Sequence, residues 1–352
     1  MDSTARKATL PIELLLICAQ QLSPRDLLPF LQALPRLTSL LPQRIWQSRD
    51  TETGQTILHL LALEGLAELL LIALQNTNIT LNQRDSKGRT ALTLAVINSH
   101  EAAVRAILSD IRTAPDTRDQ HGRSALSYAA LSGQVPMLKI LMSREDVSLE
   151  TRDAWGQTPL QNAAANGHLD AMRVLLSRLE EAVDSKHRDA CAKLALYTAA
   201  VCDRVEAFLF LLGLLPGIDL DDCYNGARTL LWVVALSGSD GVVRILLDRG
   251  VDVNACSSTG QSPLSIAAGR GNERVVKLLL DYGGVDLDSQ MDDHAYGWGT
   301  ALWHAEVNGH EAVARLIRER GGVSKGRLYY RHSGSPVTES SSSDGSDGEG
   351  GA

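Results

Sequence analysis

The thiols of this chain do not stand at spacings typical of a metal site. No two cysteines have the C-x-x-C spacing of a zinc site. An odd number of cysteines at such wide intervals is not a disulfide framework either. The cysteines lie at positions 18, 191, 202, 223 and 256. We therefore predict free thiols, buried or inert, in a reducing compartment, and no metal.

Histidine and glycine motifs that imitate catalytic sites are also incomplete. The His-Glu pairs at 100–101 and 310–311 match the start of the H-E-x-x-H zinc motif, but Val104 and Ala314 stand where the second histidine belongs. The Gly-x-Gly at 269–271 lacks the third glycine of a dinucleotide-binding loop and follows no strand. The chain has no loop that cradles phosphate and no nucleophile elbow. These patterns predict no catalytic residue and no cofactor.

An enzyme hypothesis would need an active site hidden around Cys191, Cys202 and His187. No nucleophile–base spacing in the sequence supports such a site. Paired carboxylates such as Glu180-Glu181 lie in a charged run, which is typical of a solvated face. If alkylation of all thiols changed no measurable activity, the enzyme hypothesis would fail. Binding is the function that remains.

Composition favours helix-on-helix packing and excludes several classes of function. Hydrophobic residues make up 44% of the chain but aromatics only 4%, so Leu and Ala carry the core. The net charge is −8 and the basic residues are scattered, which leaves no electrostatic footprint for nucleic acid. The apolar runs at 10–19 and 208–215 are too short to cross a membrane. We expect a soluble intracellular protein of the cytoplasm, the nucleus or both.

A repeat of 34 residues positions the side chains of most of the chain. Each copy opens with a hydroxyl residue, which serves as the N-cap of a first helix. The gap from 158 to 229 is 71 residues, about two periods, and holds a degenerate copy that keeps Leu196 and the Ala199-Ala200 pair. The opening residues stand at 56, 90, 124, 158, 229, 262 and 300. Counting the degenerate copy gives eight repeats.

The skeleton T-P-L-H-x-A-A at this period, clearest at 156–168 and 260–272, resembles the ankyrin repeat. The resemblance covers residues 50 to about 324. It implies an all-α fold, an ankyrin-repeat solenoid of stacked helix-turn-helix units with β-turn fingers. The skeleton's histidine, present as His59, implies a structural hydrogen-bond network. Residues 177–204 lose the turn pattern and form a charged connection, where we expect a bend or loosening.

The resemblance implies that a protein target binds the finger tips and the concave surface of the first helices. Trp155 stands out because a turn needs no indole and because Trp is frequent in binding hot spots. Alternatively, Trp155 packs on a neighbouring finger, and the aromatic cluster of the enlarged last finger, around 292–298, caps the final repeat. Trp232 and Trp303 hold the skeleton's histidine position and are expected in the core. The candidate finger residues are Trp155, His121, Lys87, His294, Tyr296 and Trp298.

Residues 10–46, before the repeats, read L-P-x-E-L-L, a short stretch, then L-S-P-x-D-L. This pattern resembles an F-box, although Ile17, Cys18 and Pro35 depart from it. An F-box directly before ankyrin repeats resembles an arrangement common in filamentous fungi, and it implies docking on the adaptor of a cullin–RING ubiquitin ligase. The alternative is a helical cap on the first repeat. The candidate docking residues, some of which must also hold the segment together, are Leu10, Pro11, Leu14, Leu15, Leu22 and Leu27.

The sequence therefore predicts an F-box-like segment at 1–49, ankyrin repeats at 50–324 with the degenerate copy near 190–215, and a disordered acidic tail rich in Ser and Gly at 325–352. The leading hypothesis is a substrate receptor that links a target protein to an SCF-type ubiquitin ligase. The alternative is an ankyrin scaffold with no ubiquitin link. The two differ in whether the leucine-rich edge of 1–49 is exposed or packed on the first repeat.

Overall fold

The computed structural model consists of stacked helix pairs, which confirms the predicted all-α solenoid class. The residues that it describes are 12–223, 228–289, 291–293 and 297–327. Four predicted contact residues lie outside the described residues, and these are Leu10, Pro11, His294 and Tyr296. No helix in the described part is long and apolar enough to cross a membrane.

The chain divides into two compact units whose boundary falls at the degenerate copy. Met1–Ala199 and Glu206–Pro216 form the first unit, and Ala200–Val205 and Gly217–Ala352 form the second. Each unit holds helices from neighbouring repeats in contact, first helix on first helix and second helix on second helix. This is the nearest-neighbour packing that stabilises a solenoid.

The N-terminal segment is a small set of helices that covers the first repeat. The Ser23 hydroxyl accepts a hydrogen bond from the Asp26 N–H at 3.3 Å, and Pro24 follows it as the first helical residue. The helices are α1 (Ile12–Gln21), α2 (Pro24–Ala33), the 3-10 helix η1 (Pro35–Leu40) and α3 (Gln43–Gln47). α2 and α3 contact the first repeat's α4, and η1 contacts its α5. These contacts are the packing that a cap on the first repeat would make, and the cap itself stays a prediction.

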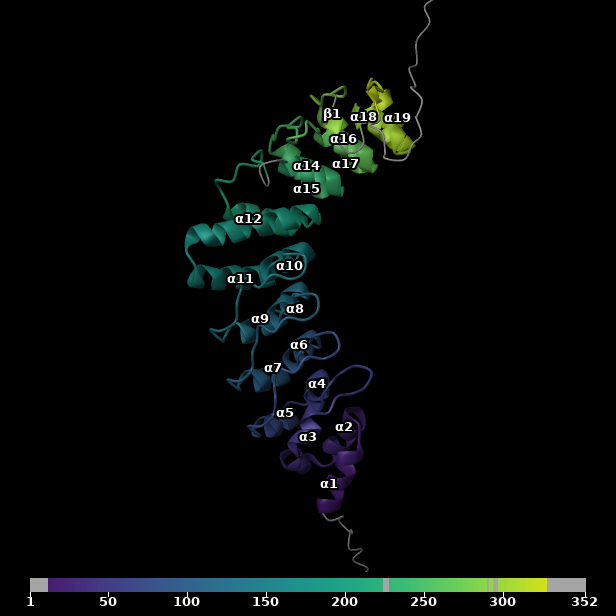
Figure 1. Ribbon diagram of the computed structural model, residues 1–352. Helices are drawn as coiled ribbons and strands as arrows, with labels where there is room; N and C mark the ends of the chain where they lie inside the picture. The colour runs from purple at the N-terminus through teal and green to yellow at the C-terminus, as the bar shows by residue number, and fades with distance from the viewer. Residues whose placement is uncertain (1–11, 224–227, 290, 294–296, 328–352) are drawn as a thin grey trace, which may run out of the picture. The chain divides into compact units, whose positions relative to one another are not determined.

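The regular repeats of the first unit place their first helices in one row and their second helices in another, as Figure 1 shows. The helices are α4 (Ile57–Leu63), α5 (Ala67–Leu74), α6 (Ala91–Ile97), α7 (Glu101–Leu108), α8 (Ala125–Leu131), α9 (Val135–Leu141), α10 (Pro159–Asn166) and α11 (Leu169–Ala182). The predicted hydroxyl caps are seen at Thr90 and Ser124, which accept from the N–H three residues on. Alanine pairs such as Ala129-Ala130 have no exposed surface, so adjacent first helices approach closely.

The degenerate copy is helical, and helices carry most of the charged run where a connection was expected. α11 continues to Ala182 and α12 (Ser185–Val201) begins after only Val183 and Asp184. α13 (Val205–Leu214) completes the pair. Leu196, Ala199 and Ala200 are fully buried, as the pattern predicts. The charged run lies on the extended helix ends because their polar faces are solvated.

The second unit repeats the same helix pairs and ends in a small sheet. Its helices are α14 (Leu230–Ser237), α15 (Asp240–Asp248), α16 (Pro263–Arg270), α17 (Glu273–Tyr282), α18 (Ala301–Val307) and α19 (Glu311–Glu319). The enlarged finger is a hairpin of β1 (Met291–Asp293) and β2 (Gly297–Gly299), with β3 (Gly326–Arg327) antiparallel to β2. Trp232 is 3% exposed and so belongs to the core, whereas Trp303 is only half-buried.

His59 holds the first turn of α4 through a buried network, as the repeat skeleton predicts. Its Nδ1 accepts the Thr56 N–H at 3.1 Å and lies 2.8 Å from the Thr56 hydroxyl oxygen. The proton therefore sits on Nε2, which lies 3.1 Å from the Arg89 carbonyl oxygen of the next repeat. Burial lowers the pKa of His59 because the charged imidazolium is poorly solvated there.

Acidification below about pH 6.5 is therefore expected to destabilise the first two repeats through His59. The imidazole of His59 takes up a proton more readily in the unfolded chain than in the folded chain. The contribution of neutral His59 to the free energy of unfolding is therefore complete above that pH. It is lost as the pH falls, by at most about 1.4 kcal/mol per pH unit. His59→Gln should flatten this dependence and keep the cap, because Gln161 makes the same bond in α10, where its Oε1 accepts the Thr158 N–H at 3.1 Å. Urea denaturation of both proteins between about pH 7 and pH 5 measures the difference. Equal acid losses in the two proteins would contradict the role of His59.

Candidate protein-binding surfaces

The finger turns of the first unit are held by buried aspartates that accept two backbone hydrogen bonds each. Asp85 Oδ1 accepts the N–H groups of Lys87 and Arg89 at 2.9 and 2.8 Å. Asp153 Oδ1 accepts those of Trp155 and Gln157 at 3.0 and 2.9 Å. The carboxylate satisfies donors that would be unpaired in the turn, so the tip residue between them is fixed in position.

Backbone hydrogen bonds join one finger to the next and align the predicted tip residues. The Gln120 N–H donates to the Lys87 carbonyl at 3.0 Å, and the Ala154 N–H donates to the His121 carbonyl at 2.8 Å. Lys87, His121 and Trp155 thus occupy equivalent places on three successive fingers, and all three are exposed. The structure brings these three predicted residues together.

Trp155 packs on the neighbouring finger and still presents its ring to solvent. Its ring stacks on His121 with centroids 5.8 Å apart and an interplanar angle of 18°. The guanidinium carbon of Arg123 lies 4.8 Å from the centroid of the indole. The side chain nevertheless remains 62% exposed. The two sequence interpretations of Trp155 are therefore compatible: the neighbour orients the indole and leaves most of it free for a partner.

A row of exposed arginines follows these fingers, and sequence reasoning did not select them. An exposed arginine precedes each buried aspartate in four successive fingers, at Arg49, Arg84, Arg118 and Arg152. The aspartates accept N–H groups of their own turns, whereas the arginines face solvent. Three of the arginines also donate to a carbonyl, as Arg152 Nη1 does to Gly156 at 2.9 Å. The recurrence of Arg-Asp about every 34 residues was the signal that could have revealed this surface.

The predicted aromatic cluster of the last finger is described only in part. Trp298 lies in β2, paired with Asp292 and Arg327 across the two neighbouring strands. His294 and Tyr296 lie outside the described residues, so this contact surface stays a prediction.

The leucine-rich edge of the N-terminal segment is divided between core and surface. Leu27 has no exposed surface, so its prediction as a docking contact is wrong: it packs in the core of the segment with Leu31. Leu14 is 48% exposed, while Leu15 and Leu22 are half-buried. Ile17, which sequence reasoning did not select, is 54% exposed. The spacing of three residues from Leu14 on one helix was the available signal.

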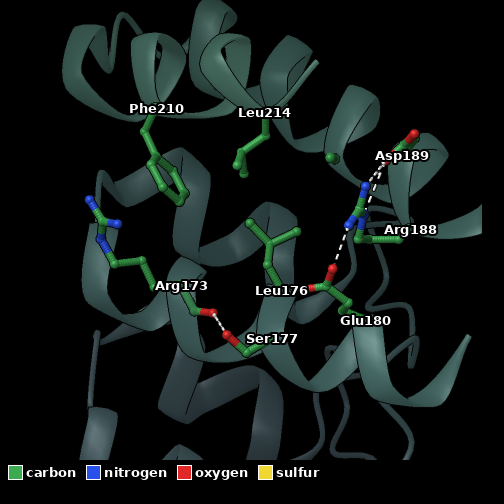
Figure 2. Close-up of a pocket in the computed structure, with 9 residues that line it drawn as sticks. Arg173, Leu176, Ser177, Glu180, Arg188, Asp189, Phe210 and Leu214 are labelled. Carbon is green, nitrogen blue, oxygen red and sulfur yellow. Dashed lines mark hydrogen bonds and ion pairs between the residues drawn. The ribbon is translucent and has the colours of Figure 1, made fainter. Parts of the chain in front are cut away.

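A groove of about 400 Å³ separates the long helices around the degenerate copy (Figure 2). Leu176, Phe210 and Leu214 line its apolar part, and the guanidinium carbon of Arg173 lies 4.5 Å from the Phe210 ring centroid. Arg188 on its rim binds Glu180 and Asp189 at 2.9 and 2.7 Å. Its apolar lining can contact an apolar side chain, and no motif in the sequence marked this groove.

Of the two predicted alternatives for the thiols, buried or inert, burial is contradicted for most of them. Cys191 is half-buried, and the other cysteines, Cys18, Cys202, Cys223 and Cys256, are exposed. Burial, together with the Glu150 carboxylate, raises the pKa of Cys191 to about 11. Its thiol is therefore protonated at neutral pH, the opposite of an activated nucleophile.

Comparison with known proteins matches the chain to one family model, described as ankyrin repeats (3 copies), over residues 32–119, 58–153, 126–224 and 230–327. The crystal structure of the human ASB11 ankyrin repeat domain is similar with a TM-score of 0.50 and 24% identity, covering 66% of this chain and 100% of that chain. That of the ankyrin repeat domain of Bcl-3, a member of the IkappaB protein family, has a TM-score of 0.41 and 24% identity, covering 76% and 100%. No curated protein matches.

Proposed function

The chain belongs to the ankyrin-repeat family, whose repeats form protein–protein interaction modules, and from this premise we propose a substrate receptor that carries a target protein to a cullin–RING ubiquitin ligase. The fingers of the first unit hold the target. The helices before the repeats dock on the ligase adaptor. Ubiquitin transfer belongs to the other subunits, so this chain needs no catalytic residue.

The exposed indole of Trp155, set beside arginines, is the observation that carries target binding. Aromatic residues with a rigid support are frequent hot spots, and Trp155 rests on His121 and Arg123. The exposed arginines Arg84 and Arg118 on the preceding fingers complement negative charge. We therefore propose a target surface that is acidic and carries an apolar side chain opposite the indole.

The adaptor hypothesis is supported by the apolar face that α1 leaves open. Leu14 and Ile17 stand three residues apart on this helix, and each is about half exposed. The buried core of the segment is made of other side chains, among them Leu27 and Leu31. Exposed apolar side chains on one helix face are typical of a surface that another helix covers.

The second candidate is a scaffold in which residues 1–49 only cap the array. Its supporting observation is the contact of α2 and α3 with α4, together with the burial of Trp46 to 2% exposure. Capping by α2 and docking by α1 use different side chains. One segment can therefore serve both purposes, and an experiment must separate them.

Co-purification with the F-box adaptor separates the two candidates. We expect the wild-type chain to retain the adaptor and Leu14→Asp/Ile17→Asp to lose it at least about 10-fold, because two charges enter the apolar contact. Both side chains are about half exposed, so the thermal stability should change little. Leu209→Asp, at a position of α13 that is 41% exposed, is the matched control and should keep the adaptor.

Two results decide against the ligase role as stated. If the wild-type chain fails to retain the adaptor, the protein is a scaffold. If the double variant binds as well as the wild type, α1 is not the docking helix.

A further inference from the structure

A histidine, a cysteine and a glutamate meet beside the degenerate copy, away from the fingers' tips. His187 Nε2 lies 2.6 Å from Glu150 Oε1, and the Cys191 thiol donates to the same oxygen at 3.2 Å. The three ligand atoms all lie within 4.8 Å of one another. They are the one such group among the residues that the structure describes.

Two segments of the first unit bring these side chains together. His187 and Cys191 stand four residues apart on α12, so they share one helix face. The start of this helix is fixed where Asp184 Oδ1 accepts the His187 N–H at 2.8 Å. Glu150 comes from the segment between α9 and α10, next to Thr151, whose buried hydroxyl lies 3.1 Å from that of Ser124.

The cluster is not arranged as a nucleophile with its base. A catalytic cysteine needs an adjacent imidazole that takes its proton, whereas here the carboxylate stands between the imidazole and the thiol. Glu150 accepts from both neighbours, which favours the protonated thiol. Thiolate, imidazole and carboxylate are instead the three ligand types of protein zinc sites.

We propose that Glu150, His187 and Cys191 bind one Zn²⁺ ion, with water in the fourth position. In a tetrahedral zinc site neighbouring ligand atoms stand roughly 3.3–3.6 Å apart. Side-chain rotations that move the three ligand atoms by about 1 Å therefore convert the hydrogen-bonded cluster into a ligand set. Binding forms a Zn–S bond and releases the thiol proton to solvent, with no change of oxidation state. This proposal is independent of the proposed function.

The hard cations Mg²⁺ and Ca²⁺ do not fit this set, because they take several oxygen ligands and avoid thiolate. Arg152 is the charged group that opposes the site: its charge acts on both Glu150 and Cys191. Its guanidinium is held 2.9 Å from the Gly156 carbonyl, so it does not occupy the ligand positions. Bound zinc would tie the segment before the Trp155 finger to α12, and so brace the degenerate copy.

Titration of the purified full chain with Co²⁺ and Zn²⁺ tests the proposal. We expect one equivalent of Co²⁺ to give a thiolate-to-cobalt charge-transfer band that Zn²⁺ abolishes. Cys191→Ser should remove the band, and His187→Ala should weaken Zn²⁺ binding at least about 100-fold, as loss of a direct ligand exceeds the effect of losing an outer partner. Arg152→Gln should bind Zn²⁺ more tightly than the wild type.

Cys202→Ser is the matched control, because it removes an exposed thiol outside the cluster and should leave the band unchanged. Circular dichroism of each apo variant establishes that the helices are retained. No charge-transfer band in the wild type, or a band that survives Cys191→Ser, would overturn the site. The same conclusion follows if His187→Ala binds Zn²⁺ as tightly as the wild type.

Discussion

Leu27→Ala is expected to lower the free energy of unfolding of the N-terminal segment and first repeat by about 2–5 kcal/mol. Leu27 has no exposed surface and sits in α2, which packs on α4. Removing the isopropyl end of its side chain leaves a cavity between rigid helices that cannot collapse onto it. Because a solenoid is stabilised through neighbour interfaces, the loss should spread to the first repeat and not remain in the segment.

Urea denaturation of the full chain, followed by circular dichroism, measures this loss. Leu14→Ala is the matched control: the residue has the same side chain in the same motif but is 48% exposed, so its cost should be about 0.5 kcal/mol. The order should be reversed for adaptor retention: Leu14→Ala should lower it more than Leu27→Ala does. Equal costs at the two positions would contradict the division of the leucine-rich edge into core and surface.

The repeats could be predicted from the sequence because each local choice agrees with the fold. A hydroxyl before the first helix, as at Ser124, satisfies the backbone N–H of Ser127, and this bond is present at 3.3 Å. The alanine pair that follows is buried, as at Ala163-Ala164, because close helix packing leaves no room for larger side chains. Even the degenerate copy kept its alanines and could be placed.

The division of the N-terminal leucines could not be predicted from the motif. Leu14 and Leu27 stand in matching apolar patterns, and only tertiary packing decides that one is open and the other buried. The same limit applies to the charged run after α11. Its residues are good helix formers, and the structure continues the helices through them where the loss of the turn pattern suggested a connection.

The candidate sites were visible in sequence only where a single unusual residue marked them. Trp155 was conspicuous because a finger turn has no need of an indole. Glu150 and His187 are 37 residues apart, and neither belongs to a metal motif, so their contact arises only when the repeats stack. Arg123 supports Trp155 from the previous finger for the same reason. Spatial neighbours one period apart are the feature that a motif search within one repeat overlooks.

Trp155→Ala is expected to weaken the binding of the target that the wild-type chain captures by about 2 kcal/mol or more, roughly a 30-fold rise in Kd. Most of the indole is free, so a partner can bury it, and its stack on His121 fixes its orientation before binding. The variant should fold normally, because an exposed cation–π contact such as that with Arg123 stabilises by only about 0.5–1 kcal/mol. Isothermal titration with the captured target gives the Kd.

Ile111→Ala is the control for this change, since Ile111 is 89% exposed in the loop after α7 and lies outside the fingers' tips. Its affinity should stay within about 0.5 kcal/mol of the wild type. Arg118→Glu should weaken binding, because the proposed target surface is acidic. This loss of affinity should grow as the salt concentration is lowered, because screening is then least. The wild type and Trp155→Ala could instead bind the target equally well, with no response to Arg118→Glu. The binding surface would then lie away from these fingers, and the groove of α11, α12 and α13 would be the surface to mutate next.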